Sequence, residues 1–145
     1  MIRDVQPGDR SVFLSMARDF YASDAVAHNV EERALETVFD DAAGGSPYIR
    51  ALIIEHDAQP AGFALLAISY ATEAGGLSVQ LEDLYIRDSF RGHGLGSEFM
   101  RYMEREYPRA KRFRLEVTPG NQGAIALYRR LGYVTLSYVQ MVKDK

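Results

Sequence analysis

The sequence predicts one α/β domain, over residues 1–145, with helices on both faces of a mixed, mostly antiparallel sheet. Two observations support this three-layer fold class. Segments with apolar residues at helical spacing are interspersed along the chain with apolar or alternating segments of strand length. Short Gly-, Pro- and Asp-containing connections separate them, and no linker, repeat or low-complexity tract divides the chain. The expected order is β-α-α-β-β-β-α-β-α-β-β, which amounts to about seven strands and four helices.

The first third of the chain is expected to hold one short strand and two helices. Residues Ile2 to Val5 form the strand, and apolar residues at helical spacing predict a helix over Asp9 to Ala22. Asn29 followed by Glu32 has the spacing of a capping box and predicts the start of a second helix. The pair Gly44-Gly45 ends it.

Three strands are expected in the middle of the chain. Tyr48 to Glu55 and Ala61 to Tyr70 are apolar runs on either side of Asp57-Ala58-Gln59-Pro60, which predicts a hairpin. Gly75-Gly76 then leads into a strand over Ser78 to Ile86.

The last third is expected to alternate helices and strands. A helix follows over Ser97 to Tyr107, and the alternation of Arg112 to Thr118 predicts a strand with Phe113, Leu115 and Val117 on one side. A short helix over Gln122 to Leu131 ends at Gly132, a usual C-cap residue. Val134 to Val142 is expected to supply the closing strands.

Composition excludes several classes of function. The chain has no cysteine, which excludes disulfides, thiolate metal sites and a cysteine acyl-enzyme. Its three histidines are scattered, so no metal site is expected. A formal charge of −3 argues against a nucleic-acid partner. The N-terminus lacks a signal-peptide pattern and no stretch is long and apolar enough for a membrane span, so a cytoplasmic location without membrane contact is expected.

The most informative motif is Arg91-Gly92-His93-Gly94-Leu95-Gly96-Ser97, between a predicted strand and a predicted helix. Its glycines permit a tight turn, and the N–H groups of the following helix would point into that turn with the positive end of the helix dipole. Such a turn binds phosphate or pyrophosphate. The spacing fits neither a nucleoside-triphosphate loop nor a dinucleotide fingerprint. A purely structural glycine-rich turn is the alternative.

The motif and its context resemble the GCN5-related N-acetyltransferase (GNAT) superfamily, in which this loop binds the pyrophosphate of acyl-CoA. The segment Gln80 to Ile86 resembles the family strand that enters the loop, and Val117 to Asn121 resembles the start of its second signature. That signature continues in Ala124, Tyr128 and Gly132-Tyr133. The resemblance covers essentially the whole chain and is strongest from about Gln80 to Tyr133. The Leu-Glu-Asp and Gly-Ser-Glu patterns look most like the spermidine/spermine (diamine) acetyltransferase branch.

This resemblance implies an enzyme that transfers an acetyl group from acetyl-CoA, without a metal, to a primary amine of a small molecule by direct attack in a ternary complex. A protein or peptide amine acetyltransferase and a non-catalytic acyl-CoA sensor remain alternatives. A homodimer is possible. Specificity in this fold comes largely from the first two helices and their connection, here about Phe20 to Glu32.

Two residues are expected to carry the catalysis. Glu82 or its neighbour Asp83 would accept the amine proton, since an alkylammonium is not nucleophilic until it is deprotonated. The diamine branch favours Glu82. Tyr128 stands seven residues after Asn121, as in the family, and would protonate the CoA thiolate. Core packing in an apolar helix stripe is the alternative for Tyr128.

The remaining candidates would hold the cofactor. The backbone of Leu84, Tyr85 and Ile86 would bond the pantetheine arm like an added strand, and an N–H near Leu84 would polarise the thioester carbonyl. The resemblance assigns the pyrophosphate to the loop residues, the pantetheine side to Asn121, and the adenosine 3′-phosphate to Arg129 or Arg130. The loop residues are Arg91, Gly92, His93, Gly94, Leu95, Gly96 and Ser97.

Overall fold

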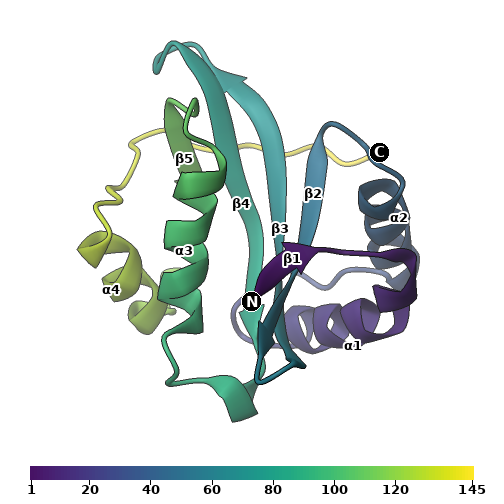
Figure 1. The fold of residues 1–145 in the computed structure, drawn as a ribbon. Coiled ribbons are helices and arrows are strands. Elements are labelled where there is room, and N and C mark those ends of the chain that lie inside the picture. The colour runs from purple at the N-terminus through teal and green to yellow at the C-terminus, as the bar shows by residue number, and fades with distance from the viewer.

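The computed structural model describes residues 1–145 and contains one five-stranded sheet with helices on both faces (Figure 1). The strands lie in chain order and are β1 (Ile2–Asp4), β2 (Ile49–His56), β3 (Gln59–Ala71), β4 (Gly76–Ile86) and β5 (Arg112–Leu115). Strands β1 to β4 pair antiparallel and β5 lies parallel to β4. The predicted fold class, with a mixed and mostly antiparallel sheet, is confirmed.

Two helices cover each face of the sheet (Figure 1). Helices α1 (Arg10–Tyr21) and α2 (Glu32–Ala43) pack on one face, and α3 (Leu95–Glu106) and α4 (Gln122–Arg130) lie on the other. Two short 3-10 turns, η1 (Pro7–Asp9) and η2 (Asp88–Phe90), precede α1 and α3. None of the helices is both long and apolar enough to cross a bilayer.

The middle of β2 and the middle of β3 are apolar on both sides because both faces of the sheet are covered there. In β2, Ala51 and Ile53 belong to the core under α1 and α2, whereas Leu52 and Ile54 belong to the core under α3. The predicted hairpin is present. Asp57 and Ala58 turn between β2 and β3 with φ angles of 49° and 61°, the pair of positive values that a two-residue hairpin turn requires.

Some element boundaries differ from those predicted. Helix α2 begins at Glu32, not near Asn29, and its N-cap Glu31 makes no side-chain cap bond. Instead, Glu32 accepts hydrogen bonds from Arg18 of α1. The strand expected over Arg112 to Thr118 ends at Leu115, because β5 diverges from β4 beyond that residue.

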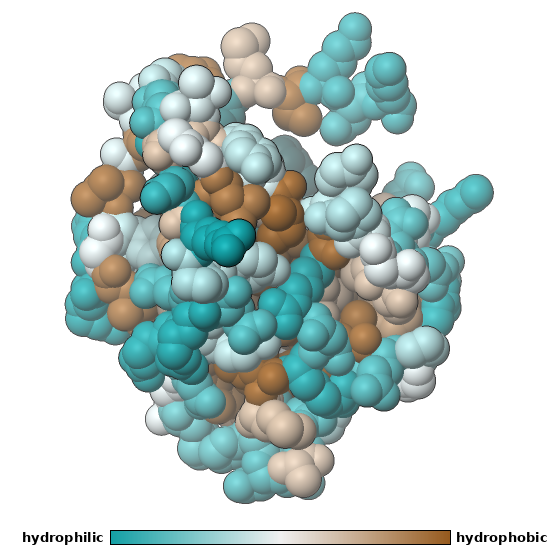
Figure 2. Space-filling view, turned by 45° about the horizontal axis from the view of Figure 1, so that its top comes forward, coloured by the Kyte–Doolittle hydropathy of each residue, from teal (hydrophilic) through white to brown (hydrophobic).

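The expected closing strands over Val134 to Val142 are not formed, so the sheet has five strands instead of about seven. Alternating apolar residues predict an extended chain, but a strand also needs a partner backbone, which alternation does not identify. The segment leaves α4 and makes one side-chain hydrogen bond, from Tyr138 to Glu73. Exposed large apolar side chains are therefore concentrated here: Val134, Leu136, Tyr138, Val139, Met141 and Val142. On the face shown in Figure 2, hydrophobic and hydrophilic residues are interspersed.

An irregularity in β4 creates an opening between β4 and β5. Leu81 pairs with Leu66 and Asp83 with Leu65, so Glu82 is an extra residue, a β-bulge. The pairing of β4 with β5 covers only Ser78 to Leu81, although β4 continues to Ile86. From Glu82 onward the strand therefore has a backbone partner on its β3 side only.

Candidate active site

A pocket of about 110 Å³ lies where β4 and β5 separate. It reaches both helical layers, because Phe20 and Ala25 come from the α1 side and Ala124 and Tyr128 from α4. The strands contribute carboxylates and apolar residues. Its complete lining is Phe20, Ala25, Leu81, Glu82, Leu84, Leu115, Glu116, Val117, Asn121, Ala124 and Tyr128.

Glu82 and Asp83 occupy different surroundings. Glu82 lines the pocket and makes no hydrogen bond or ion pair, and its pKa is raised by burial and by the charge of Glu116. Asp83 is buried and accepts a hydrogen bond of 2.7 Å from the hydroxyl of Tyr21. Burial raises the pKa of Asp83 to about 6. Of the two, only Glu82 has a free carboxylate facing the opening.

Tyr128 lies on the α4 side of the same pocket. Its hydroxyl has no hydrogen-bond partner, and burial raises its pKa, which keeps the phenol protonated at neutral pH. Its ring also contacts the core under α3, with the Tyr133 ring centroid 6.0 Å away. Tyr128 thus makes packing contacts with the core, and it also has the free phenol that a proton donor needs.

Asn121 is the N-cap of α4, where its side-chain oxygen accepts a hydrogen bond of 3.2 Å from the N–H of Ala124. This contact satisfies one of the free N–H groups at the start of the helix. Asn121 also lines the pocket. Its amide nitrogen donates to no protein group, which leaves it available to a ligand.

The glycine-rich loop leads into a helix as predicted, although α3 begins at Leu95 and not at Ser97, and the short turn η2 stands between β4 and the loop. Gly92 and Gly94 have φ angles of 83° and 74°, and Gly94 is the N-cap of α3. No side chain caps this helix, so its first N–H groups are open, and a Cβ built at Gly94 would meet no protein atom within 4 Å. The loop has the backbone freedom, the open space and the free donors that an anion needs.

The polar side chains of the loop have mainly structural contacts. Arg91 pairs with Asp88 at 3.1 Å and donates to the carbonyl of Ile86. The ring of His93 lies 4.8 Å from that of His56, and its Nδ1 contacts the carbonyl of Phe90 at 3.0 Å. Within the loop, these contacts involve side chains alone, and no side chain caps the N–H groups of Leu95, Gly96 and Ser97 at the helix start.

The other cofactor candidates lie on β4 and in α4. Leu84, Tyr85 and Ile86 pair with β3 on one side, and their other backbone edge has no strand partner. Arg129 and Arg130, in the last turn of α4, are exposed and make no ion pair, so the structure does not distinguish between them. An unpaired strand edge beside an open helix start fits the extended pantetheine arm and pyrophosphate of acetyl-CoA.

Seven of the eleven lining residues were not among the predicted site residues: Phe20, Ala25, Leu81, Leu115, Glu116, Val117 and Ala124. Phe20 and Ala25 lie within the segment expected to govern specificity, but helical periodicity marks Phe20 only as core. The alternation predicted for Arg112 to Thr118 places Glu116 on the side opposite Phe113 and Leu115. This alternation could have predicted that Glu116 points away from the Phe113 side. It could not have predicted that Glu116 lies beside Glu82.

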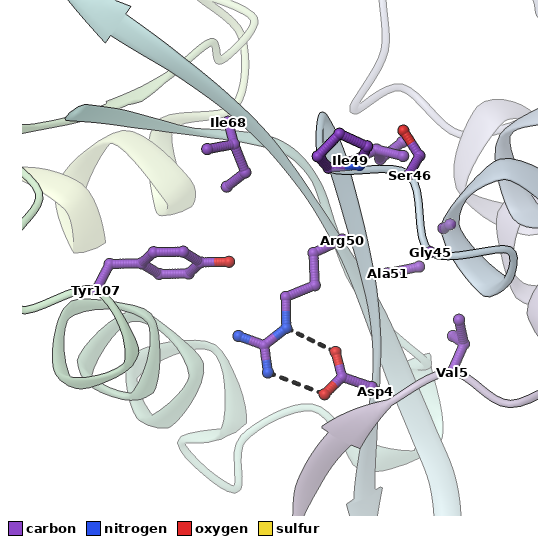
Figure 3. A pocket seen from close by; sticks show the side chains of 11 residues that line it. Asp4, Val5, Gly45, Ser46, Ile49, Arg50, Ala51, Ile68 and Tyr107 are labelled. Carbon is purple, nitrogen blue, oxygen red and sulfur yellow. Dashed lines mark hydrogen bonds and ion pairs between the residues drawn. The ribbon is translucent and has the colours of Figure 1, made fainter.

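A larger cavity of about 380 Å³ lies elsewhere, between β1, β2, the end of α2 and Tyr107 (Figure 3). Its one cation, Arg50, is engaged by both carboxylate oxygens of Asp4, at 2.6 and 3.0 Å. Glu106 and the hydroxyl of Tyr102 accept further hydrogen bonds from the same guanidinium. Because these carboxylates neutralise Arg50, the cavity offers no free cation to an anion, and the smaller pocket is the better candidate.

Comparisons with known proteins identify the family of this chain. The acetyltransferase (GNAT) family model matches residues 13–133, which include the pocket and the glycine loop. The chain is 28% identical over 144 residues to a thialysine N-epsilon-acetyltransferase of Sus scrofa, an alignment that covers 91% of this chain and 82% of the relative.

Solved structures show the same fold. A possible acetyltransferase from Clostridium difficile 630 superposes with a TM-score of 0.83 at 13% identity, covering 100% of this chain and 97% of the other. An aminoglycoside N-acetyltransferase, AAC(6')-Iy, solved in complex with CoA, has a TM-score of 0.79 at 15% identity, with coverages of 100% and 94%. The family match extends over most of the chain, and the chain belongs to the acetyltransferase (GNAT) family of N-acetyltransferases.

Proposed function

We propose that the protein transfers an acetyl group from acetyl-CoA to a primary amine of a small molecule at the opening between β4 and β5. One observation carries this proposal. Glu82 and Tyr128, a free carboxylate and a free phenol, line one pocket beside an unpaired strand edge. The names of the relatives add support, since they describe enzymes that act on the amines of thialysine and aminoglycosides.

Acetyl-CoA supplies an activated acyl group as a thioester. The backbone of Leu84 to Ile86 would bond its pantetheine arm, and an N–H near Leu84 would polarise the thioester carbonyl. The N–H groups at the start of α3, in the loop Arg91 to Ser97, would bind its pyrophosphate. Arg129 or Arg130 would meet the 3′-phosphate, and Asn121 would bond the pantetheine through its free amide nitrogen.

Glu82 would accept the proton of the acceptor's ammonium, directly or through water. The released lone pair forms the new N–C bond as the C–S bond of the thioester breaks. The raised pKa of Glu82 favours this role, because it brings the proton affinity of the carboxylate closer to that of the amine. Tyr128 would give its proton to the departing thiolate, and its own raised pKa keeps that proton available.

Steady-state release of free CoA with a panel of amines tests this proposal. The panel contains primary alkylamines, diamines, amino acids with a side-chain amine, an aminoglycoside and lysine peptides. We expect CoA release with at least one small amine, matched by an equal amount of acetylated amine in the mass spectrum. Turnover of peptides alone would favour the peptide acetyltransferase, and acetyl-CoA binding without any turnover would favour the sensor.

A further inference from the structure

Glu116 was not among the predicted site residues, yet the structure brings it to the reaction pocket. Leu81 of β4 and Leu115 of β5 are the last pair of the parallel ladder. Glu82 follows Leu81 in β4, and Glu116 is the first residue after the end of β5, so the register carries both carboxylates to the start of the opening. Both line the same pocket.

Neither carboxylate has a protein partner. No hydrogen bond or ion pair involves Glu82 or Glu116, and no Lys or Arg lines the pocket. By contrast, Glu55 of β2 pairs with Arg3 at 2.9 Å. Two unpaired like charges at one opening repel each other, and a cation between them removes that repulsion.

We propose that Glu116 is a further residue of the acceptor site, where its carboxylate and that of Glu82 together hold the acceptor's ammonium group before its proton leaves. The inference rests on the proposed function. The two glutamates have separate roles in it. Glu82 receives the proton, whereas Glu116 keeps its charge, attracts the ammonium and makes Glu82 a stronger base.

The charges around Glu82 agree with this division of roles. Burial raises the pKa of Glu82 most, the charge of Glu116 raises it further, and no cation acts in the opposite direction. On the α1 side, the charge of Glu82 in turn raises the pKa of Tyr21 and of Asp83. On the α4 side lies the neutral phenol of Tyr128. Glu116 is thus the one acidic side chain from outside β4 whose charge acts on Glu82.

The test compares the wild type with Glu116→Gln, Glu116→Asp and a control, Glu104→Gln, which removes the same charge from an exposed, unpaired position on α3. A first measurement needs no turnover. The Glu82 carboxyl is titrated by carbon-detected NMR, and we expect its pKa to fall by roughly half a unit or more in Glu116→Gln, since a like charge is gone. Glu116→Asp and Glu104→Gln should leave it near the wild-type value.

A second measurement is kcat/KM for the amine between pH 5 and pH 9 at saturating acetyl-CoA. We expect Glu116→Gln to raise the KM for the amine by about 5-fold or more near neutral pH, to shift the acidic limb to lower pH, and to leave acetyl-CoA affinity unchanged. Glu116→Asp should restore most of the loss. An unaltered Glu82 titration and amine KM in Glu116→Gln would overturn the inference.

A third result would also overturn it. If Glu116→Gln abolished the acidic limb while Glu82→Gln retained it, Glu116 would itself be the base. The kinetic results require an active wild type, so they are distinct from failure of the proposed function, in which the wild type acetylates no amine. The Glu82 titration can be measured in either case. Because Glu116 is exposed and unbonded, its substitution should not unfold the protein.

Discussion

The buried carboxyl of Asp83 should make the stability of this protein depend on pH in a way that one substitution removes. Asp83 is 6% exposed and its one side-chain partner is the Tyr21 hydroxyl. Its pKa rises from 3.8 to about 6, mainly because burial disfavours the charged form. In Asp83→Asn this titration is absent.

The sign follows from proton binding. Between pH 4 and pH 6 the folded protein keeps a proton on Asp83 that the unfolded chain has already lost, so stability falls as the pH rises through this window. A shift from 3.8 to about 6, at 1.36 kcal/mol per pKa unit, corresponds to about 3 kcal/mol. Relative to Asp83→Asn, the wild type should therefore lose up to about 3 kcal/mol of unfolding free energy between pH 4 and pH 7.

Urea unfolding followed by circular dichroism at several pH values measures this difference. The other carboxylates are present in both proteins, so their titrations largely cancel, with Glu82 as the one nearby exception. In Tyr21→Phe the carboxyl loses the hydrogen bond that lowers its pKa, so the same window should extend to higher pH. A free-energy difference between wild type and Asp83→Asn that stayed constant from pH 4 to pH 7 would refute this account of Asp83.

Three further predictions concern the proposed site. Tyr128→Phe should lower kcat by about 10²-fold with little change in acetyl-CoA affinity. The matched control Tyr133→Phe also removes a buried hydroxyl without a partner and should keep the wild-type kcat. Equal kcat values in the two variants would mean that Tyr128 has a packing role only. Glu82→Gln should depress kcat/KM most near neutral pH and less at high pH, where free amine is abundant, and Asp83→Asn should lack this pattern in the same pH profile. Acetyl-CoA should raise the midpoint of thermal unfolding without added metal because it binds the folded state, and the increase should grow with the acetyl-CoA concentration. An unchanged midpoint would argue against binding.

Local sequence signals were sufficient for the elements that build the site. The glycine loop, the α4 helix with Asn121 at its start, and the hairpin at Asp57 depend on backbone preferences and short-range spacing, which a sequence displays directly. The same signals placed Glu82 and Tyr128 on the two elements that flank the opening.

Features that depend on pairing between distant segments were not predictable in this way. The bulge at Glu82 arises from the register of β4 against β3, and it places Leu81 and Leu84 in the same core although plain alternation would separate them. The position of Glu116 depends on where β5 leaves β4. The segment Val134 to Val142 has the alternating pattern of a strand, but that pattern does not show which strand the segment would pair with.

Binding of acetyl-CoA to the loop before α3 is the central claim, and isothermal titration of glycine variants tests it most directly. Gly94 and Gly75 both have positive φ, 74° and 81°, and a Cβ at either meets no protein atom within 4 Å. Gly94→Val and Gly75→Val therefore impose similar backbone strain, but only the first places a side chain where the pyrophosphate would approach. We expect Gly75→Val to bind acetyl-CoA like the wild type and Gly94→Val to bind at least about 10-fold more weakly. Equal affinities in the two folded variants would contradict the assignment of this loop to the cofactor.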